Sequence, residues 1–302
     1  MLVQDLKSFF ERCPSLEFIQ IQIPYLPRQP ASPPRKRVPL AALKELRLDE
    51  TASASGLLDH LILPRCTQLI LKGQFTGAAL DRYGFHAARI HSSSIDHLPV
   101  TTEITKVVAM PNSCILSGPN GDIRLWCPEG CARGNFDAEF LTSLSPIHVL
   151  EIKELWVGHS TMSSFYPGPW LQGLPGIRGA FAVLPKVEDL TIVGCVTEPF
   201  FTALNPSTTA SSAGMDTLLP VLRKLTVYVA PRDLNICELI RCMRVRKRHS
   251  RPLGKVAIVF MEEVGVKITR KVELLREFVE VLEYYVGEAP ALIWKGVDRE
   301  DW

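Results

Sequence analysis

The stretch LPVLRKLTVYV, Leu219 to Val229, carries the pattern on which the fold prediction rests. Its apolar residues Leu222, Leu225 and Val227 lie three and then two positions apart. The last two follow the period of a β-strand and point to one face, while the first packs inward from the turn that enters the strand. Such a turn–strand unit has one apolar side and cannot bury it alone, so copies must stack.

The same spacing recurs along the chain. The six further copies are Leu16/Ile19/Ile21, Leu43/Leu46/Leu48, Cys66/Leu69/Leu71, Ile147/Leu150/Ile152, Val187/Leu190/Ile192 and Leu253/Val256/Ile258. The first intervals are 27 residues (16 to 43) and 23 residues (43 to 66), and the later ones are 40 (147 to 187), 35 (187 to 222) and 31 (222 to 253). Leucine-rich repeats are roughly 20 to 29 residues long. We therefore predict one α/β domain over residues 1–302, an irregular leucine-rich-repeat-like solenoid of stacked short parallel strands with long loops.

Several segments depart from this pattern. Trp156–Gly179 and Asn205–Thr217 are predicted loops, and residues 73–134 form a less regular insertion. Within that insertion, CILSGPNGDIRLW places a turn at Pro119–Asp122 between two apolar runs, which predicts a β-hairpin that projects from the sheet or extends it.

Two segments have the apolar spacing of helices. Asp233–Arg248 carries Leu234, Cys237, Ile240 and Met243 along one face, and Ile268–Val286 carries a heptad-like apolar stripe. We expect the second helix to belong to a helical cap over about residues 264–302. A doubly wound α/β sheet is the competing fold, but it predicts longer apolar strands and glycine-rich turns before its helices.

Composition excludes several classes of protein. The chain has 34 lysines and arginines against 32 aspartates and glutamates, so its overall charge does not favour nucleic acid or an anionic membrane. Its longest apolar run, VAIVFM at Val256–Met261, is far shorter than the roughly 20 residues of a membrane helix. The start of the chain lacks a secretory profile, and eight irregularly spaced cysteines do not form a disulfide framework. We expect a reduced protein of the cytoplasm or nucleus, without a membrane partner.

The region from Leu184 to Val286, including LPVLRKLTVYVAPRDLNICELIRCMRVRKRHSRPLGKVAIVFMEE and REFVEVLEYYVG, resembles the C-terminal part of F-box proteins from mushroom-forming basidiomycetes. The front half is similar only in style. The resemblance implies degenerate leucine-rich-like strands and a substrate-recruiting subunit of a cullin-type ubiquitin ligase. The F-box of that family is not visible before Leu16, so we expect the ligase linker protein as a partner only if an F-box is missing from this chain.

A basic cluster spans Arg241 to Arg251 (RCMRVRKRHSR) and contains the candidate partner-binding residues Arg244, Arg246, Lys247 and Arg248. Such a cluster is able to bind phosphates or acidic groups. The alternative is a solvated end of a helix, where cations are favoured by the helix dipole. Because aromatic residues are not interleaved with the cations, stacking on nucleic-acid bases is not indicated.

Aromatic residues mark a second candidate surface. Phe165, Tyr166 and Trp170 lie in the long predicted loop, with Phe181 nearby. Aromatic side chains dominate the energetics of protein interfaces, so these are candidate partner-binding residues. The equally weighted alternative is that they fold back as local core beneath the loop.

Motifs for other chemistry are weak. His86, His91 and His97 with Cys127 and Cys131 do not match the usual spacing of zinc ligands, and we predict neither a metal nor a cofactor. The loop GLPGIRG at Gly173–Gly179 lacks the Lys-Ser/Thr of a phosphate-binding loop. The basic run in PPRKRVP, Pro33 to Pro39, has a nuclear-import interpretation and an ordinary solvated-loop interpretation.

These patterns together favour a non-enzymatic protein–protein interaction module, with the substrate-recognition part of an F-box-type ubiquitin ligase as its implied role. Two alternatives stay open. One is an enzyme whose catalytic residues are dispersed along the chain, and the other is weak nucleic-acid binding through residues 241–251.

Overall fold

The computed structural model describes residues 3–22, 37–49, 57–58, 60–72, 98–110, 113–126, 151–158, 173–194, 197–205 and 218–288. These residues form the elements α1 (Val3–Arg12), β1 (Phe18–Gln22), β2 (Val38–Pro39), β3 (Glu45–Asp49), β4 (Leu61–Ile62), β5 (Gln68–Lys72), η2 (Pro99–Thr101), β6 (Lys106–Met110), β7 (Ser113–Gly118), β8 (Gly121–Trp126), β9 (Glu154–Gly158), α5 (Gly173–Ala182), β10 (Asp189–Val193), α6 (Glu198–Leu204), β11 (Lys224–Val229), η6 (Pro231–Asp233), α7 (Ile236–Arg248), β12 (Lys255–Phe260), α8 (Val266–Glu273), η7 (Leu274–Glu277) and β13 (Val281–Val286).

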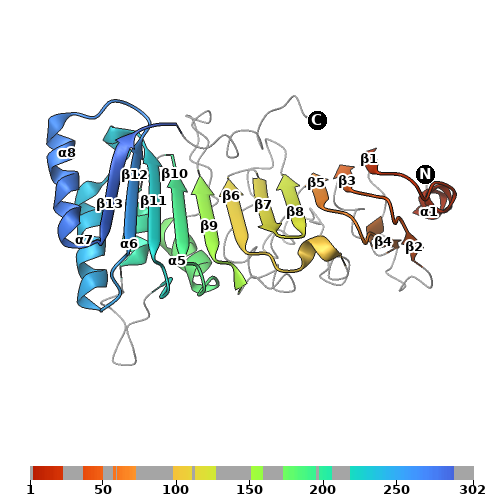
Figure 1. Ribbon diagram of the computed structural model, residues 1–302, viewed down its shortest axis with the longest axis horizontal. Coiled ribbons are helices and arrows are strands. Elements are labelled where there is room, and N and C mark those ends of the chain that lie inside the picture. Colours follow the sequence, from red (N-terminus) through yellow and green to blue (C-terminus); the bar gives the residue numbers. More distant parts are fainter. Residues whose placement is uncertain are drawn as a thin grey trace. The chain divides into compact units, whose positions relative to one another are not determined.

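The fold is mixed α/β, with a large, mostly parallel sheet and few helices (Figure 1). The sheet has 11 strands in the order β1-β3-β5-β8-β7-β6-β9-β10-β11-β12-β13, and β2 and β4 form a separate two-stranded parallel sheet. The predicted short parallel strands are therefore confirmed. The chain divides into two compact units, one of residues 1–107 and 112–149 and one of residues 108–111 and 150–302.

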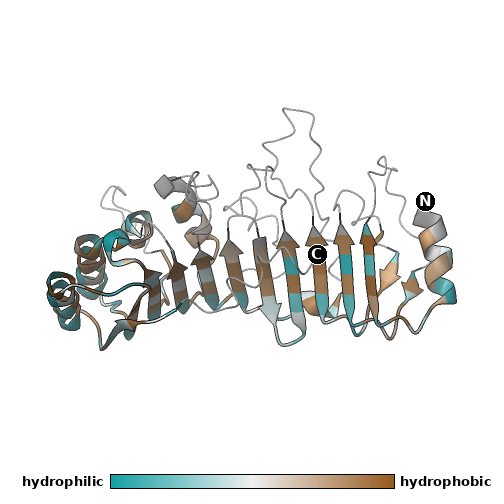
Figure 2. Cartoon of the chain, turned by 90° about the horizontal axis from the view of Figure 1, so that it is seen from above, coloured by the Kyte–Doolittle hydropathy of each residue, from teal (hydrophilic) through white to brown (hydrophobic). Residues whose placement is uncertain are grey.

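In the first unit, the apolar positions of successive turn–strand units lie side by side. The parallel strands β1, β3, β5 and β8 are in register, which aligns Ile19, Leu46, Leu69 and Ile123. Leu46 and Leu69 have no exposed surface. Hydrophobic and hydrophilic bands alternate along these strands (Figure 2), as expected for strands with one buried face.

In the second unit, five parallel strands continue the same arrangement. The registers of β9 to β13 align Leu155, Leu190, Leu225, Val256 and Leu282 in one row and Val157, Ile192, Val227, Ile258 and Tyr284 in the next. Burying one such aliphatic side chain contributes about 1.5 to 3 kcal/mol. In Figure 1 the helices α5, α6 and α7 lie behind these strands, against this apolar face.

The turns that enter the strands also stack. The carbonyl of Lys153 accepts hydrogen bonds from the amides of Glu188 and Asp189 at 2.8 and 3.0 Å, and the carbonyl of Glu188 accepts from Arg223 and Lys224 at the same distances. The backbone amides of each turn thus donate to a carbonyl of the turn in the preceding turn–strand unit, so these amides have hydrogen-bond partners.

The turn–strand unit is longer than the sequence pattern indicates. Three residues before its first apolar position, Leu184 and Leu219 are fully buried, and their carbonyls accept the amides of Val187 and Leu222 at 3.3 and 3.1 Å. Leu40 and Leu63 repeat this in the first unit. A fourth inward residue therefore closes the turn in these copies.

One predicted copy is wrong in register. The strand β9 begins after the predicted Ile147/Leu150/Ile152 triplet, and it is Leu155 that pairs with Leu190. The copy in the structure is Ile152, Leu155 and Val157, five residues later, and all three are buried. Residues 147 and 150 lie outside the described residues. The prediction failed because IHVLEIKELWV contains two overlapping triplets with the same spacing.

The predicted helix Ile268–Val286 is also wrong. The segment is the short helix α8, the 3-10 turn η7 and the strand β13, which pairs in parallel with β12. Val281 to Val286 contains two valines and two tyrosines, which favour strands. Leu282 completes the apolar row, and the Tyr284 hydroxyl donates a hydrogen bond to Glu273 of α8. A hydrogen bond from Arg276 lowers the pKa of Glu273 most, and the hydrogen bond from Tyr284 lowers it further.

Other helices differ less from expectation. The predicted helix Asp233–Arg248 is confirmed as α7 from Ile236 onward, preceded by the 3-10 turn η6. Its predicted apolar face is wrong, because Cys237 is exposed and the buried residues of α7 are Ile236, Leu239, Cys242, Met243 and Arg246. The segment Gly173–Gly179, predicted as a loop, instead begins the helix α5. The sequence analysis did not anticipate α1, in which Leu6 and Phe10 are buried.

The predicted hairpin is confirmed and extends the sheet. β7 and β8 pair antiparallel with Gly118 opposite Gly121, while β8 also pairs in parallel with β5. Gly121 has a φ of +127°, and a Cβ atom there would lie 1.9 Å from the carbonyl oxygen of Thr67. Only glycine fits at this position without displacing the backbone of Thr67, the residue that precedes β5.

Replacement of Leu225 by alanine tests the buried row. Leu225 has no exposed surface and lies between Leu190 and Val256, so L225A should lower the free energy of unfolding by about 2 to 5 kcal/mol. The control V221A, at a residue that is 43% exposed, should change it by less than about 0.5 kcal/mol. Urea denaturation followed by circular dichroism measures both, and similar losses would contradict the burial of the row.

Replacement of Gly121 by alanine tests the hairpin turn. G121A should destabilise the protein by more than about 1 kcal/mol, because both the positive φ and the contact with Thr67 oppose a side chain. G254A is the matched control, since the nearest atom to a Cβ at Gly254 is 3.5 Å away. If thermal melting gives equal midpoints for G121A and the wild-type protein, the turn is not formed as described.

Candidate interaction surface

The register of β9 to β12 fixes which side chains lie on the face opposite the helices, here called the open face. The residues alternate with the buried ones and form two rows across the four strands. The charged row is Glu154, Asp189, Lys224 and Lys255, and the short row is Trp156, Thr191, Thr226 and Ala257. A rigid sheet thus presents side chains at fixed spacing.

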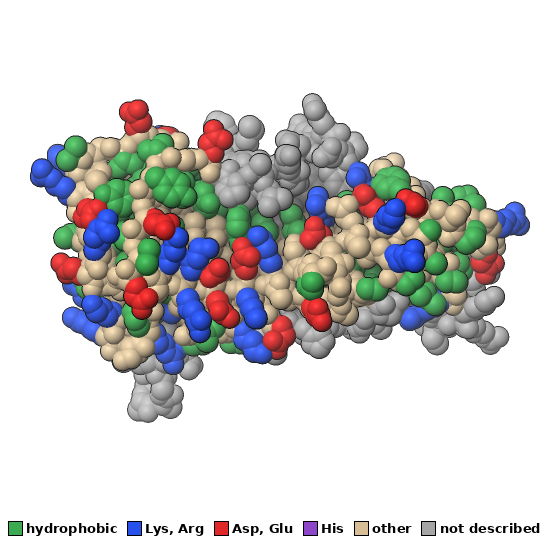
Figure 3. Space-filling view, viewed as in Figure 1, with side chains coloured by type: hydrophobic (Ala, Val, Ile, Leu, Met, Phe, Trp, Pro, Cys, Tyr) green, Lys and Arg blue, Asp and Glu red, His purple; other side chains and the backbone are tan. Residues whose placement is uncertain are grey.

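Three members of the charged row, Asp189, Lys224 and Lys255, form exposed ion pairs within the chain. Lys224 lies 3.6 Å from Asp189, with side chains 44% and 41% exposed, and Lys255 lies 2.7 Å from Glu283 of β13. Ion pairs at such exposure contribute about 0 to 1 kcal/mol, because water screens them. Basic and acidic side chains lie next to one another across this face in Figure 3. Asp189, Lys224 and Lys255 are therefore able to exchange these ion pairs for pairs with a binding partner at little cost to the fold.

The short row forms the floor beside these charges. Thr191, Thr226 and Ala257 are buried, because their short side chains lie between longer neighbours. Trp156, at the end of the row, is half-buried, and its indole nitrogen donates to the carboxylate of Glu154. A partner that contacts this floor must reach between the charged side chains, which favours a shaped protein surface over a flat one.

Further along the same strands the next row includes Val193, Tyr228 and Val259. Tyr228 is half-buried. Burial is the main cause that raises its pKa, and the neighbouring Tyr285 adds a smaller contribution in the same direction. Its hydroxyl therefore stays protonated at neutral pH and is able to donate a hydrogen bond. Tyrosine with an apolar body and a polar tip is common in protein interfaces.

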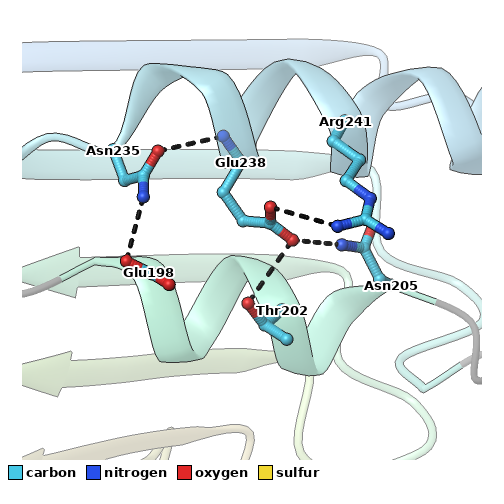
Figure 4. Close-up of polar contacts among 6 residues, drawn as sticks. All are labelled: Glu198, Thr202, Asn205, Asn235, Glu238 and Arg241. Carbon is cyan, nitrogen blue, oxygen red and sulfur yellow. Dashed lines mark hydrogen bonds and ion pairs between the residues drawn. The ribbon is translucent and has the colours of Figure 1, made fainter.

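Behind the open face, polar contacts hold α6 against α7 (Figure 4). Glu238 accepts a hydrogen bond from Asn205 at 2.7 Å and pairs with Arg241 at 3.7 Å. Asn235 caps α7 by accepting from the amide of Glu238 at 3.1 Å, and its amide donates to Glu198 of α6 at 3.0 Å. These contacts connect α6 with α7, so we assign the polar residues involved a structural role.

The first unit carries a polar cluster on the corresponding face of its strands. The Arg47 guanidinium lies 5.3 Å from the centre of the Phe18 ring and pairs with Glu45. With its amide oriented to satisfy both groups, Gln68 donates to Glu45 at 3.0 Å and accepts from Arg124 at 3.2 Å. We place the candidate surface on the second unit because there the registers align one charged row and one short row across four neighbouring parallel strands.

Three of the predicted basic site residues, Arg244, Lys247 and Arg248, are exposed on α7, whereas Arg246 is buried. The Arg244 guanidinium lies 5.4 Å from the centre of the Phe278 ring, and Lys247 lies 6.0 Å from it. Lys247 also donates to the carbonyl of Glu277. Arg244 and Lys247 thus also contact η7 and the segment before β13, and Arg248 lies at the end of the helix.

Arg246 requires a correction, since it is fully buried and is not part of an exposed surface. Its guanidinium donates to the carbonyls of Leu218 and Leu219 at 3.3 and 3.1 Å, and burial lowers its pKa. Leu219 has a φ of +48°, a strained conformation for leucine. Arg246 therefore holds the strained turn that enters β11. Helical spacing alone did not separate Arg246 from its exposed neighbours.

The aromatic candidates Phe165, Tyr166 and Trp170 lie outside the described residues, and their role stays a prediction. Phe181, their neighbour in the sequence, is buried in α5. The histidines and cysteines weighed as metal ligands also lie outside the described residues. Where the structure describes the chain, no group of three or more His, Cys, Asp or Glu side chains is placed to hold a metal.

Buried thiols in the described strands and helices are not activated. Burial raises the pKa of Cys66 to about 11, that of Cys242 to about 12, and that of Cys114 as well. A thiol reacts as the thiolate, so these three cysteines are poor nucleophiles at neutral pH. Among the described helices, none has the length and apolar character needed to cross a bilayer.

The sequence analysis missed the open face. Its signal was present, because the residue just before the second apolar position of four successive units is Glu154, Asp189, Lys224 or Lys255. Each is an ordinary charged residue, and the row exists only when the strands are in register. Models of known protein families give no match to this chain, and neither do the curated proteins.

Replacement of Arg246 by alanine tests its structural role. R246A leaves the carbonyls of Leu218 and Leu219 without their donor, so it should lower the free energy of unfolding by about 2 to 4 kcal/mol. The control R248A, at an exposed residue of the same helix, should change it by less than about 0.5 kcal/mol. Guanidinium denaturation that gives equal losses for the two variants would contradict the assignment.

Proposed function

We propose that the chain is a non-enzymatic protein–protein interaction module, and that its contact surface is the open face of β9 to β12. The observation that supports this most is the pair of in-register rows, one charged and one short, on four neighbouring parallel strands. The strands that carry these rows are buried and hydrogen-bonded, so binding of a partner costs little conformational entropy.

We also propose that the turn–strand units form an irregular leucine-rich-repeat-like solenoid. Support comes from the shared unit, with its buried entry residue, its stacked turn and its two inward strand residues. In such a protein each unit contributes one residue to each outward row, so the partner is selected by the residues between the repeated apolar positions of the unit. Here those residues are Glu154, Asp189, Lys224 and Lys255.

The cellular role that the sequence resemblance implies is the choice of targets for ubiquitination. We propose it on the resemblance of Leu184–Val286 to basidiomycete F-box proteins alone. Under this proposal the open face binds the target. Co-purification of the chain with cullin-ligase components from the organism that makes it would support the role, and their repeated absence would remove it without affecting the interaction surface.

Nucleic-acid binding through residues 241–251 receives less support. Arg246 is buried, Arg244 and Lys247 contact Phe278, and Arg241 pairs with Glu238, so four of the cluster's six lysines and arginines have partners in the chain. A phosphate-binding surface needs several cations that are free to neutralise the backbone. The open face is the stronger candidate.

Replacement of Thr226 by arginine tests the proposed surface. The long cation would rise from the centre of the short row and block a partner, while Thr226 lies on the face away from the helices. Tagged wild-type protein, T226R and the control R248E should be purified from extracts of the source organism, with quantitative mass spectrometry. A specific partner should be retained by R248E and reduced at least tenfold by T226R. Equal recovery with both variants would place the contact elsewhere.

A further inference from the structure

Acidic and basic side chains do not alternate along the charged row, as they would if each side chain formed an ion pair with a neighbour in the row. Across β9, β10, β11 and β12 it reads acid, acid, base, base, so like charges lie on neighbouring strands at both ends: Glu154 beside Asp189, and Lys224 beside Lys255. Like charges on neighbouring strands of one face repel one another. Within the chain, Lys224 pairs with Asp189, Lys255 pairs with Glu283, and Glu154 accepts a hydrogen bond from Trp156. A partner with the reverse order would place a further opposite charge against each member of the row.

We propose that the open face binds a second copy of this chain, face to face, about a two-fold axis parallel to the strands and between β10 and β11. The inference rests on the proposed function and names the partner of that same surface. A rotation about this axis reverses the order of the strands but keeps every row at its own height. The reversed order is complementary in charge to the row itself.

The rotation places opposite charges together along the whole row. β10 then faces β11 of the other copy, so Asp189 lies opposite the partner's Lys224. β9 faces β12, so Glu154 lies opposite the partner's Lys255. Each contact occurs twice, as an isologous interface requires. A pattern of four charges that is converted into its own complement by one two-fold axis is the observation that carries the proposal.

The short row is complementary under the same axis. Trp156, the largest side chain of the row, lies opposite the partner's Ala257, the smallest. Thr191 lies opposite the partner's Thr226, and two short side chains at the centre let the sheets approach. The large-to-small pairing follows from the registers alone and is independent of charge.

The expected dimer is weak. Four strands about 4.8 Å apart and five or six residues long, at about 3.3 Å per residue, give a patch of roughly 350 Å² per copy, less than half of what a standard interface uses. The tilt of about 30° between packed sheets keeps the central pairs aligned better than the outer ones. Association should therefore depend on concentration and weaken with salt.

Sedimentation velocity on the purified full chain tests the proposal, over about 1 to 200 µM, a range suited to weak interfaces. The wild-type protein should shift from monomer to dimer, and 0.5 M salt should reduce the dimer at least threefold. K224E/K255E makes the row wholly acidic, and E154K/D189K makes it wholly basic. Each variant should stay monomeric at all concentrations, with circular dichroism and melting midpoint unchanged.

Mixing the two variants in equal amounts is the decisive step. The acidic row of one should pair with the basic row of the other, so dimers should reappear only in the mixture. R248E/R251E is the matched control, because it reverses two exposed cations outside the open face, and it should dimerise like the wild-type protein.

Three results would overturn the inference: a wild-type chain that stays monomeric at 200 µM, a dimer that survives both row reversals, or variants that fail to associate on mixing. The proposed function fails differently. If T226R loses its cellular partner while the wild-type protein is monomeric, the open face serves another protein and only the self-association is wrong.

Discussion

The alignment of apolar side chains between neighbouring parallel strands is the constraint on which the rest of the structure depends. Leu190, Leu225 and Val256 are fully buried and occupy one row, although their units are separated by loops of different length. A shift of one residue in any strand would expose that strand's apolar side chains and bury its charged ones. The register is therefore fixed by burial, and loops of unequal length are tolerated because they do not enter the row.

That same register creates the surface to which we assign function. Because residues alternate between faces, fixing Leu225 toward the core fixes Lys224 and Thr226 toward the opposite side. Turn stacking and the buried Arg246 restrain the entry to β11, so these side chains stand on a backbone that has little freedom. A binding face built in this way keeps its geometry without a partner, and its specificity lies in residues that contribute little to stability.

The parts of the fold that follow from local pattern were predictable, and the parts that depend on register were not. The units at Leu222 and Leu253, the hairpin and α7 have unambiguous spacing. The unit at Ile152 was missed by five residues because two triplets overlap. β13 was mistaken for a helix because Val279, Leu282 and Val286 also fit helical spacing. The strand conformation depends on pairing with β12, which the local sequence does not show. The charged row required knowledge of which residues are neighbours across strands.

Methyl contacts measured by NMR test the aligned row most directly. In a deuterated sample with labelled leucine and valine methyl groups, Leu225 should show strong nuclear Overhauser effects to both Leu190 and Val256, since it lies between them. Leu155 should contact Leu190 but not Val256. Contacts of Leu225 with residues two positions further along either strand, in place of these, would show a different register and contradict the account.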